Sequence, residues 1–264
     1  MNRYMGESQK VRIQYSAKKA SVANAWKKWQ GEVKGLKKMK TIDVKKAFEA
    51  EFDKWAAGGE FAGVTGRLDS LYKAMEALSF ATDYYNETVR SCEIGNFAMS
   101  MARLFKDGKY DSGSAAELSD SFFKDYCISI DKEIFSAMMD EFGRNIPEDM
   151  QPEYFKKQMK QFGNTQKWAD HIFGKSLFTR PDKVRSLTVK DRKKVMKDPA
   201  TVFFNEFVKW YYADIRPDIQ RLEAEMQLAY RDYMRGQIAY ARTQRIPKAF
   251  YPDANLTLRV SYGH

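Results

Sequence analysis

The sequence predicts an all-α fold. Apolar residues recur at three- and four-residue spacing over long stretches, and clusters of Gly, Pro and polar residues separate these stretches. Strict alternation of apolar and polar residues is confined to the end of the chain. With 264 residues, 44% of them hydrophobic and 14% aromatic, the chain is long enough for one large or two small domains with a sizeable core.

The first predicted helix has two distinct faces. One face is an apolar stripe at heptad-like spacing, made of Tyr15, Val22, Trp26, Trp29 and Val33. The other face is mostly small and consists of Ala17, Ala20, Asn24, Lys27 and Gly31. Another element or a ligand can therefore approach the helix closely around Asn24, whereas core packing is the expected role of the aromatic residues.

Two long helices are expected next. Residues 65–105 keep the 3-4 spacing without a proline, which predicts one helix on the order of 60 Å long. After a turn at residues 107–113, the spacing resumes at Leu118, Phe122, Tyr126, Ile130, Ile134 and Met138. The short connection favours a long antiparallel helical hairpin.

Shorter helices follow the hairpin. They are expected around residues 151–162, 165–173 and 188–195. Asp198 before Pro199 is typical of an N-cap followed by proline at the first helical position, and it opens an aromatic-rich helix. Asp214 and Pro217 suggest a similar start for a last helix that reaches about Arg242.

The carboxyl-terminal tail breaks the helical pattern. Apolar and polar residues alternate over residues 256–262, as in a half-buried β-strand. A lone strand leaves backbone donors and acceptors unpaired, so it normally belongs to a sheet that other residues supply. We therefore expect a β-rich domain to follow His264.

The charge of the chain is strongly basic. A formal charge of +10 makes nucleic acid, an anionic membrane and acidic peptides candidate partners. The densest basic runs, residues 34–40 and 190–197, are interrupted by apolar residues as a solvated helix face would be, and no nucleic-acid motif accompanies them. No apolar run approaches the roughly 20 residues of a membrane span. A freestanding basic helical module that binds nucleic acid or an acidic protein remains the alternative interpretation.

Residues that could carry catalysis are scarce. The histidines are His171, within a short amphipathic helix where a structural role is the common one, and the terminal His264. Carboxylate pairs occur at Glu49 with Asp53 and at Asp140 with Glu141, as on any charged helical surface. Cys92 and Cys127 are expected to be free thiols, although their pairing is left open, and no Cys/His spacing predicts a metal or cofactor site.

Two segments carry a resemblance to a known family. KVRIQYSAKKASVANAWK at residues 10–27 and YPDANLTLRVSYG at residues 251–263 resemble segments of the bacterial dipeptidyl peptidases 7 and 11. In that family an α-helical domain is inserted within a chymotrypsin-like double β-barrel and caps the active site. The resemblance implies that residues 1–250 form the helical cap domain and residues 251–264 the strand that re-enters the peptidase domain.

The same resemblance implies a function. It places the catalytic histidine and aspartate before this segment and the nucleophilic serine after it, so we expect the isolated chain to be inactive. These serine peptidases release dipeptides from free peptide amino termini, and the resemblance assigns to Asn24 a contact with the substrate's α-ammonium group, which an amide oxygen can accept as a hydrogen bond. The alternative role of Asn24 is a hydrogen bond to a neighbouring helix.

The family also implies a setting for the parent enzyme. It is expected to be periplasmic or on the cell surface of a Gram-negative bacterium, to be a homodimer and to need no cofactor. Its preference for acidic or hydrophobic side chains is left open, since the residues that set it lie outside this segment.

Overall fold

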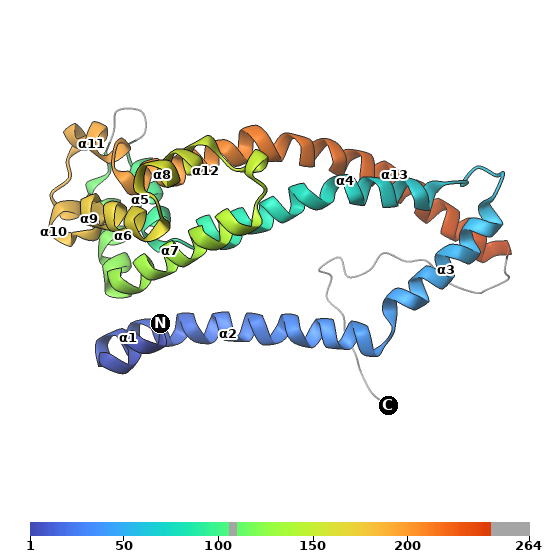
Figure 1. Ribbon diagram of the computed structural model, residues 1–264, viewed down its shortest axis with the longest axis horizontal. Coiled ribbons are helices and arrows are strands. Elements are labelled where there is room, and N and C mark those ends of the chain that lie inside the picture. The colour runs from blue at the N-terminus through green and yellow to red at the C-terminus, as the bar shows by residue number, and fades with distance from the viewer. Residues whose placement is uncertain (106–109, 244–264) are drawn as a thin grey trace. The chain divides into compact units, whose positions relative to one another are not determined.

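The computed structural model describes residues 1–105 and 110–243, and in these residues the chain forms helices joined by turns, with no β-strand (Figure 1). The all-α prediction is thereby confirmed. The described residues divide into two compact units, one within residues 1–34 and 75–221 and the other within residues 35–74 and 222–243. No helix among the described residues is both long and apolar enough to cross a membrane. The predicted strand and the predicted domain boundary at residue 250 lie outside the described residues.

The helical elements follow one another closely along the described chain. The α-helices are α1 (Asn2–Glu7), α2 (Gln9–Lys38), α3 (Thr41–Ala56), α4 (Val64–Tyr84), α5 (Glu93–Arg103), α6 (Ser112–Lys124), α7 (Ile128–Asn145), α8 (Glu153–Phe162), α9 (Thr165–Lys175), α10 (Pro181–Arg185), α11 (Arg192–Met196), α12 (Pro199–Trp210) and α13 (Arg216–Thr243). Short 3-10 turns are η3 (Glu148–Met150), η4 (Leu177–Thr179) and η5 (Val189–Asp191), and π-helical turns are η1 (Tyr85–Val89) and η6 (Tyr211–Ile215).

An aromatic core holds the first unit together. Phe135 of α7, Trp168 of α9 and Phe203 of α12 are almost fully buried, and the ring of Phe135 lies 5.1 Å from that of Trp168 and 4.9 Å from that of Phe203. The rings meet edge to face, the arrangement that aromatic quadrupoles favour. At Gly95, a Cβ would lie 3.0 Å from the ring of Phe204, so glycine permits the close approach of α5 and α12. The short helices α8–α11 gather around this core with α5 and α6 (Figure 1).

The prediction of one long helix over residues 65–105 is wrong, because two α-helices form there. Helix α4 runs into η1, the chain turns at residues 90–92, and α5 begins at Glu93. The start of α5 is capped by the carboxylate of Asp131, which accepts the backbone N–H groups of Glu93 and Ile94. Such a cap lies far away in sequence, so local spacing cannot reveal it.

The second predicted long helix is also divided. It breaks at residues 125–127 into α6 and α7. Helix α7 nevertheless packs against η1 in the antiparallel sense. Near its start, Asp131 contacts the start of α5, which follows η1. Farther along α7, the ring of Phe142 contacts that of Trp210, which in turn contacts Tyr85 at the beginning of η1. The hairpin is thus present, with both arms interrupted.

The two proline signals had different outcomes. Asp198 caps α12 by accepting the N–H of Ala200 at 2.9 Å, with Pro199 at the first helical position, as predicted. The predicted new start at Asp214 is wrong, because the π-helical turn η6 carries the chain directly from α12 into α13. Pro217 lacks an N–H and would crowd a carbonyl four residues earlier, and the wider π turn accommodates both effects.

The second unit is built from α3, the first part of α4 and the later part of α13. Phe52 of α3 is fully buried there. A Cβ on Gly236 of α13 would lie 2.7 Å from the ring of Phe52, so glycine permits the close approach of α3 and α13. Helices α4 and α13 run antiparallel, as shown by the ion pair of Arg67 with Asp232 at 3.4 Å and the hydroxyl contact of Tyr72 with Tyr230. Aromatic rings around Phe52 complete the cluster and belong to Phe48, Trp55, Phe61, Tyr233 and Tyr240.

Candidate functional site

Asn24 lies on an exposed part of α2. Among the described residues, its side-chain amide has no hydrogen-bonding partner, so the alternative role as a link to a neighbouring helix finds no support there. Its face of the helix is shallow, because Ala17, Ala20 and Gly31 lie on the same side at about 100° per residue, and no atom approaches within 4 Å of the place where a Cβ of Gly31 would stand. The amide is therefore accessible to a ligand.

The opposite face of α2 is apolar and is also exposed. The exposed fractions are 63% for Val22, 63% for Trp26, 64% for Trp29 and 48% for Val33. The expectation that the aromatic residues of this helix pack in a core is therefore wrong for Trp26 and Trp29, and within the predicted stripe only Tyr15 is fully buried. The stripe is defined below as Val22, Trp26, Trp29 and Val33.

The amino-terminal half of α2 is fastened to the break between α6 and α7. Gln14 donates from Nε2 to the carbonyl oxygen of Lys124 at 2.8 Å, and Lys18 donates from Nζ to that of Asp125 at 2.6 Å. The N–H of Cys127 in turn donates to the hydroxyl oxygen of Tyr15 at 3.1 Å. Side chains from α2 thus satisfy backbone groups that the helix break leaves without helical partners.

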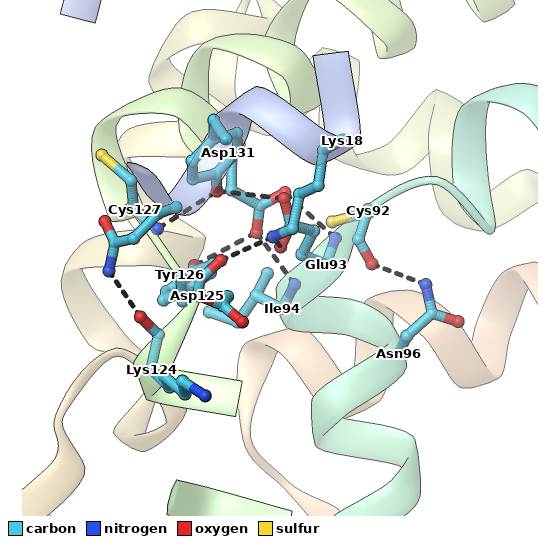
Figure 2. A network of polar contacts seen from close by, with 12 residues as sticks. Lys18, Cys92, Glu93, Ile94, Asn96, Lys124, Asp125, Tyr126, Cys127 and Asp131 are labelled. Atoms are coloured by element: carbon cyan, nitrogen blue, oxygen red, sulfur yellow. Dashed lines mark hydrogen bonds and ion pairs between the residues drawn. The ribbon is translucent and has the colours of Figure 1, made fainter. Parts of the chain in front are cut away.

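Glu93 joins the same network from α5. Its carboxylate accepts the hydroxyl of Tyr15 at 3.0 Å. It also pairs with the ammonium group of Lys18 at 2.5 Å (Figure 2). Burial, followed by the nearby charge of Glu93, raises the pKa of Tyr15. The hydroxyl therefore stays protonated and can donate to Glu93 while it accepts from Cys127. We call Gln14, Tyr15 and Lys18, with their partners, the α2 clamp.

Asp131 is fully buried beneath the α2 clamp and contacts its member Glu93. Its carboxylate accepts the N–H of Glu93 at 3.0 Å, the N–H of Ile94 at 2.8 Å and the hydroxyl of Tyr126 at 3.1 Å (Figure 2). Burial raises the pKa of Asp131 to about 7, and the charge of Glu93 adds to this effect while the hydrogen bonds oppose it. Asp131 is thus a buried acid held at a helix start.

The other candidate residues have structural partners. His171 is half-buried and its ring lies 4.9 Å from that of Phe162, as expected for a packed residue. Cys92 and Cys127 are free thiols, and burial raises the pKa of Cys92 well above its usual value. The lysines of the run at residues 190–197 are exposed around the buried Val195, which agrees with a solvated helix face.

The paired carboxylates also make local contacts. Asp53 accepts the hydroxyl of Thr65 at 2.6 Å, and Asp140 accepts that of Thr165 at 2.7 Å. Glu141 pairs with an arginine one turn farther along its own helix. In the part of the chain that the structure describes, no three His, Cys, Asp or Glu side chains come together in a way that could hold a metal ion.

The fold is similar to that of a known peptidase structure. The chain matches the crystal structure of Porphyromonas endodontalis DPP11 with a TM-score of 0.75 and 21% identity, over 90% of this chain and 36% of that one. The same protein in complex with the dipeptide Arg-Glu matches with a TM-score of 0.73, over 91% and 36%. At this identity the similarity shows the shared helical fold.

Sequence relatives point the same way. An Asp/Glu-specific dipeptidyl-peptidase of Flavobacterium psychrophilum is 28% identical over 98% of this chain and 38% of its own length. Dipeptidyl-peptidase 7 of Porphyromonas endodontalis is 30% identical over 98% of this chain and 32% of its own length. The chain thus spans about a third of the length of these relatives. Because residues 1–264 match the family model Peptidase S46 throughout, the chain belongs to peptidase family S46.

Proposed function

We propose that this chain is the helical substrate-capping domain of a serine-type dipeptidyl peptidase that releases dipeptides from the amino termini of peptides. The rest of the longer protein supplies the nucleophile and the general base. Family membership and the names of the relatives support this assignment. So does the state of the candidate residues, since His171 and the paired carboxylates are engaged in structural contacts.

In this proposal, Asn24 binds the free amino terminus of the peptide. Its amide oxygen accepts a hydrogen bond from the α-ammonium group, which helps to position the substrate from its free end. The observation that carries the assignment is the exposed amide on a small-residue face, with no partner among the described residues. A bound ammonium group would supply that partner.

The rest of the peptidase, with its double β-barrel, is the proposed covering partner of the exposed stripe on α2. Two tryptophans and two valines on one face form an apolar surface of a kind that usually marks an interface. The parent is proposed to be a homodimer located in the periplasm or on the cell surface of a Gram-negative bacterium. The net charge of +10 suits acidic peptides, while the relatives include both an Asp/Glu-specific enzyme and dipeptidyl-peptidase 7.

The test is Asn24→Ala in the full-length enzyme with free-amino dipeptide substrates. We expect kcat/KM to fall about 10- to 150-fold, which corresponds to about 1.5 to 3 kcal/mol of lost transition-state stabilisation, the size of a hydrogen bond to a charged group. Gln30→Ala is the matched control, because Gln30 is an exposed amide on the same helix but lies about a third of a turn away from Asn24. Equal kcat/KM in the Asn24 variant and the parent would contradict the assignment.

A further inference from the structure

Helix α2 contacts the α6–α7 break near its amino-terminal end and along one side. Gln14, Tyr15 and Lys18 lie on the side that faces the α6–α7 break, and Gln14 and Tyr15 are buried there. Beyond this point the residues of α2 up to Val33 are largely exposed. The direction and the rotation of that exposed part are therefore set mainly by the α2 clamp.

The spacing between Tyr15 and Asn24 links the α2 clamp to the proposed site. Nine residues of an α-helix correspond to two and a half turns and a rise of about 14 Å. Asn24 therefore lies on the side of α2 opposite to Tyr15. A tilt of α2 at Tyr15 would move the Asn24 amide sideways by several ångströms, because the two residues are about 14 Å apart along the helix axis. A rotation of α2 about its axis would turn the amide away from its original direction.

We propose that Tyr15 is the positioning residue for Asn24: its hydroxyl, held between the Glu93 carboxylate and the Cys127 N–H, fixes α2 so that the Asn24 amide meets the peptide's amino terminus. This inference rests on the proposed function of Asn24. Tyr15 itself is fully buried, and its hydroxyl is engaged by Glu93 and Cys127. Its effect passes through the helix that both residues share.

The hydroxyl of Tyr15 is the connecting atom of the network. It donates to Glu93 of α5 at 3.0 Å and accepts from Cys127, next to α7, at 3.1 Å. Without this oxygen the N–H of Cys127 loses its acceptor at the break, and Glu93 retains Lys18 as its partner from α2. Tyr15→Phe removes the oxygen while it keeps the buried ring, so the packing is preserved.

The test measures kinetics of the full-length enzyme carrying Tyr15→Phe. We expect kcat/KM for free-amino dipeptide substrates to fall about 3- to 10-fold, mainly through a higher KM, because a small displacement weakens binding of the amino terminus. In the Asn24→Ala background, Tyr15→Phe should have almost no further effect on kcat/KM. A merely structural role would instead lower the active fraction, and hence kcat, equally in both backgrounds.

Two further variants keep the test decisive. Tyr4→Phe is the control, since the Tyr4 hydroxyl also donates to a glutamate, Glu133, but from α1 and outside the α2 clamp. Gln14→Ala weakens the clamp at Lys124 with Tyr15 intact, and it replaces Tyr15→Phe if that variant does not fold. We expect Gln14→Ala to raise KM in the same direction and Tyr4→Phe to leave it unchanged.

Hydrogen exchange separates this inference from the proposed function. The amides of residues 19–34 should exchange faster in Tyr15→Phe than in the parent. If Asn24→Ala lowers kcat/KM but Tyr15→Phe does not, the positioning role is overturned. If Asn24→Ala has no effect, the proposed function fails, and hydrogen exchange alone decides whether Tyr15 orients α2: unchanged exchange overturns that claim and faster exchange upholds it.

Discussion

Helices α2 and α12 both carry large apolar side chains at three- and four-residue spacing, but they bury them differently. In α12, Phe203, Phe204 and Phe207 are buried against neighbouring helices. In α2, Trp26 and Trp29 are 63% and 64% exposed. The same periodicity therefore predicts an apolar face on both helices. Which element packs against that face depends on the rest of the fold.

The largest expected contrast is in stability. Phe203→Ala should lower the free energy of unfolding of the 264-residue chain by about 3 to 5 kcal/mol, because the ring is fully buried against Phe135, Trp168 and Phe207. Urea unfolding followed by circular dichroism measures this difference. A loss below about 1 kcal/mol would show that the aromatic core does not determine stability.

The second expected effect is a pH dependence of stability that comes from Asp131, which is buried beneath the α2 clamp. Because the pKa of Asp131 is raised to about 7 in the fold and is near 4 in an unfolded chain, the protonated form is favoured by folding. Its contribution to stability is complete below about pH 4 and is lost as the pH rises through about 7. The titratable groups that interact with it belong to Glu93 and Cys92 near α5, Tyr126 before α7 and Tyr15 of α2, and Lys18 of α2 pairs with Glu93.

Asp131→Asn isolates this contribution. As the pH falls from about 7 to about 5, the parent should gain stability relative to the variant by up to about 1.4 kcal/mol per pH unit. Parallel stability curves for the two proteins between these pH values would mean that Asp131 does not titrate there. Paired urea titrations at each pH provide the measurement.

The smallest expected effect is in the exposed stripe. Trp26→Ala should change the free energy of unfolding of this chain by no more than about 0.5 kcal/mol, since its side chain is largely exposed. The same urea experiment as for Phe203→Ala gives the comparison directly. A loss as large as that of Phe203→Ala would mean that another part of this chain covers the stripe in solution.

Local signals predicted part of the fold well. The all-α class and the N-cap at Asp198 follow from spacing and from Asp-Pro chemistry, and both are present. The helix breaks at residues 90–92 and 125–127 could not be predicted, because their backbone groups are satisfied by Asp131 and Tyr15, which are distant in sequence. Spacing identifies the apolar faces of helices, whereas these two helix breaks depend on long-range hydrogen bonds.

The candidate site shows the same division. The small-residue face around Asn24 was visible in the sequence, and the structure leaves that face exposed. Tyr15 was identified only as one member of an apolar stripe. Its hydroxyl contacts with Glu93 and Cys127 have no local signature, since the partners lie 78 and 112 residues away.

The most direct test of the account pairs Asn24 with the amino group that it is proposed to bind. In the full-length enzyme, kcat/KM would be measured for the parent and Asn24→Ala on a free-amino dipeptide substrate and on its N-acetylated form, which cannot present an ammonium group. The account predicts a loss of about 10- to 150-fold from Asn24→Ala on the free-amino substrate and almost none on the acetylated one. Equal losses on both substrates, or no loss on either, would contradict a role for Asn24 in binding the peptide's amino terminus.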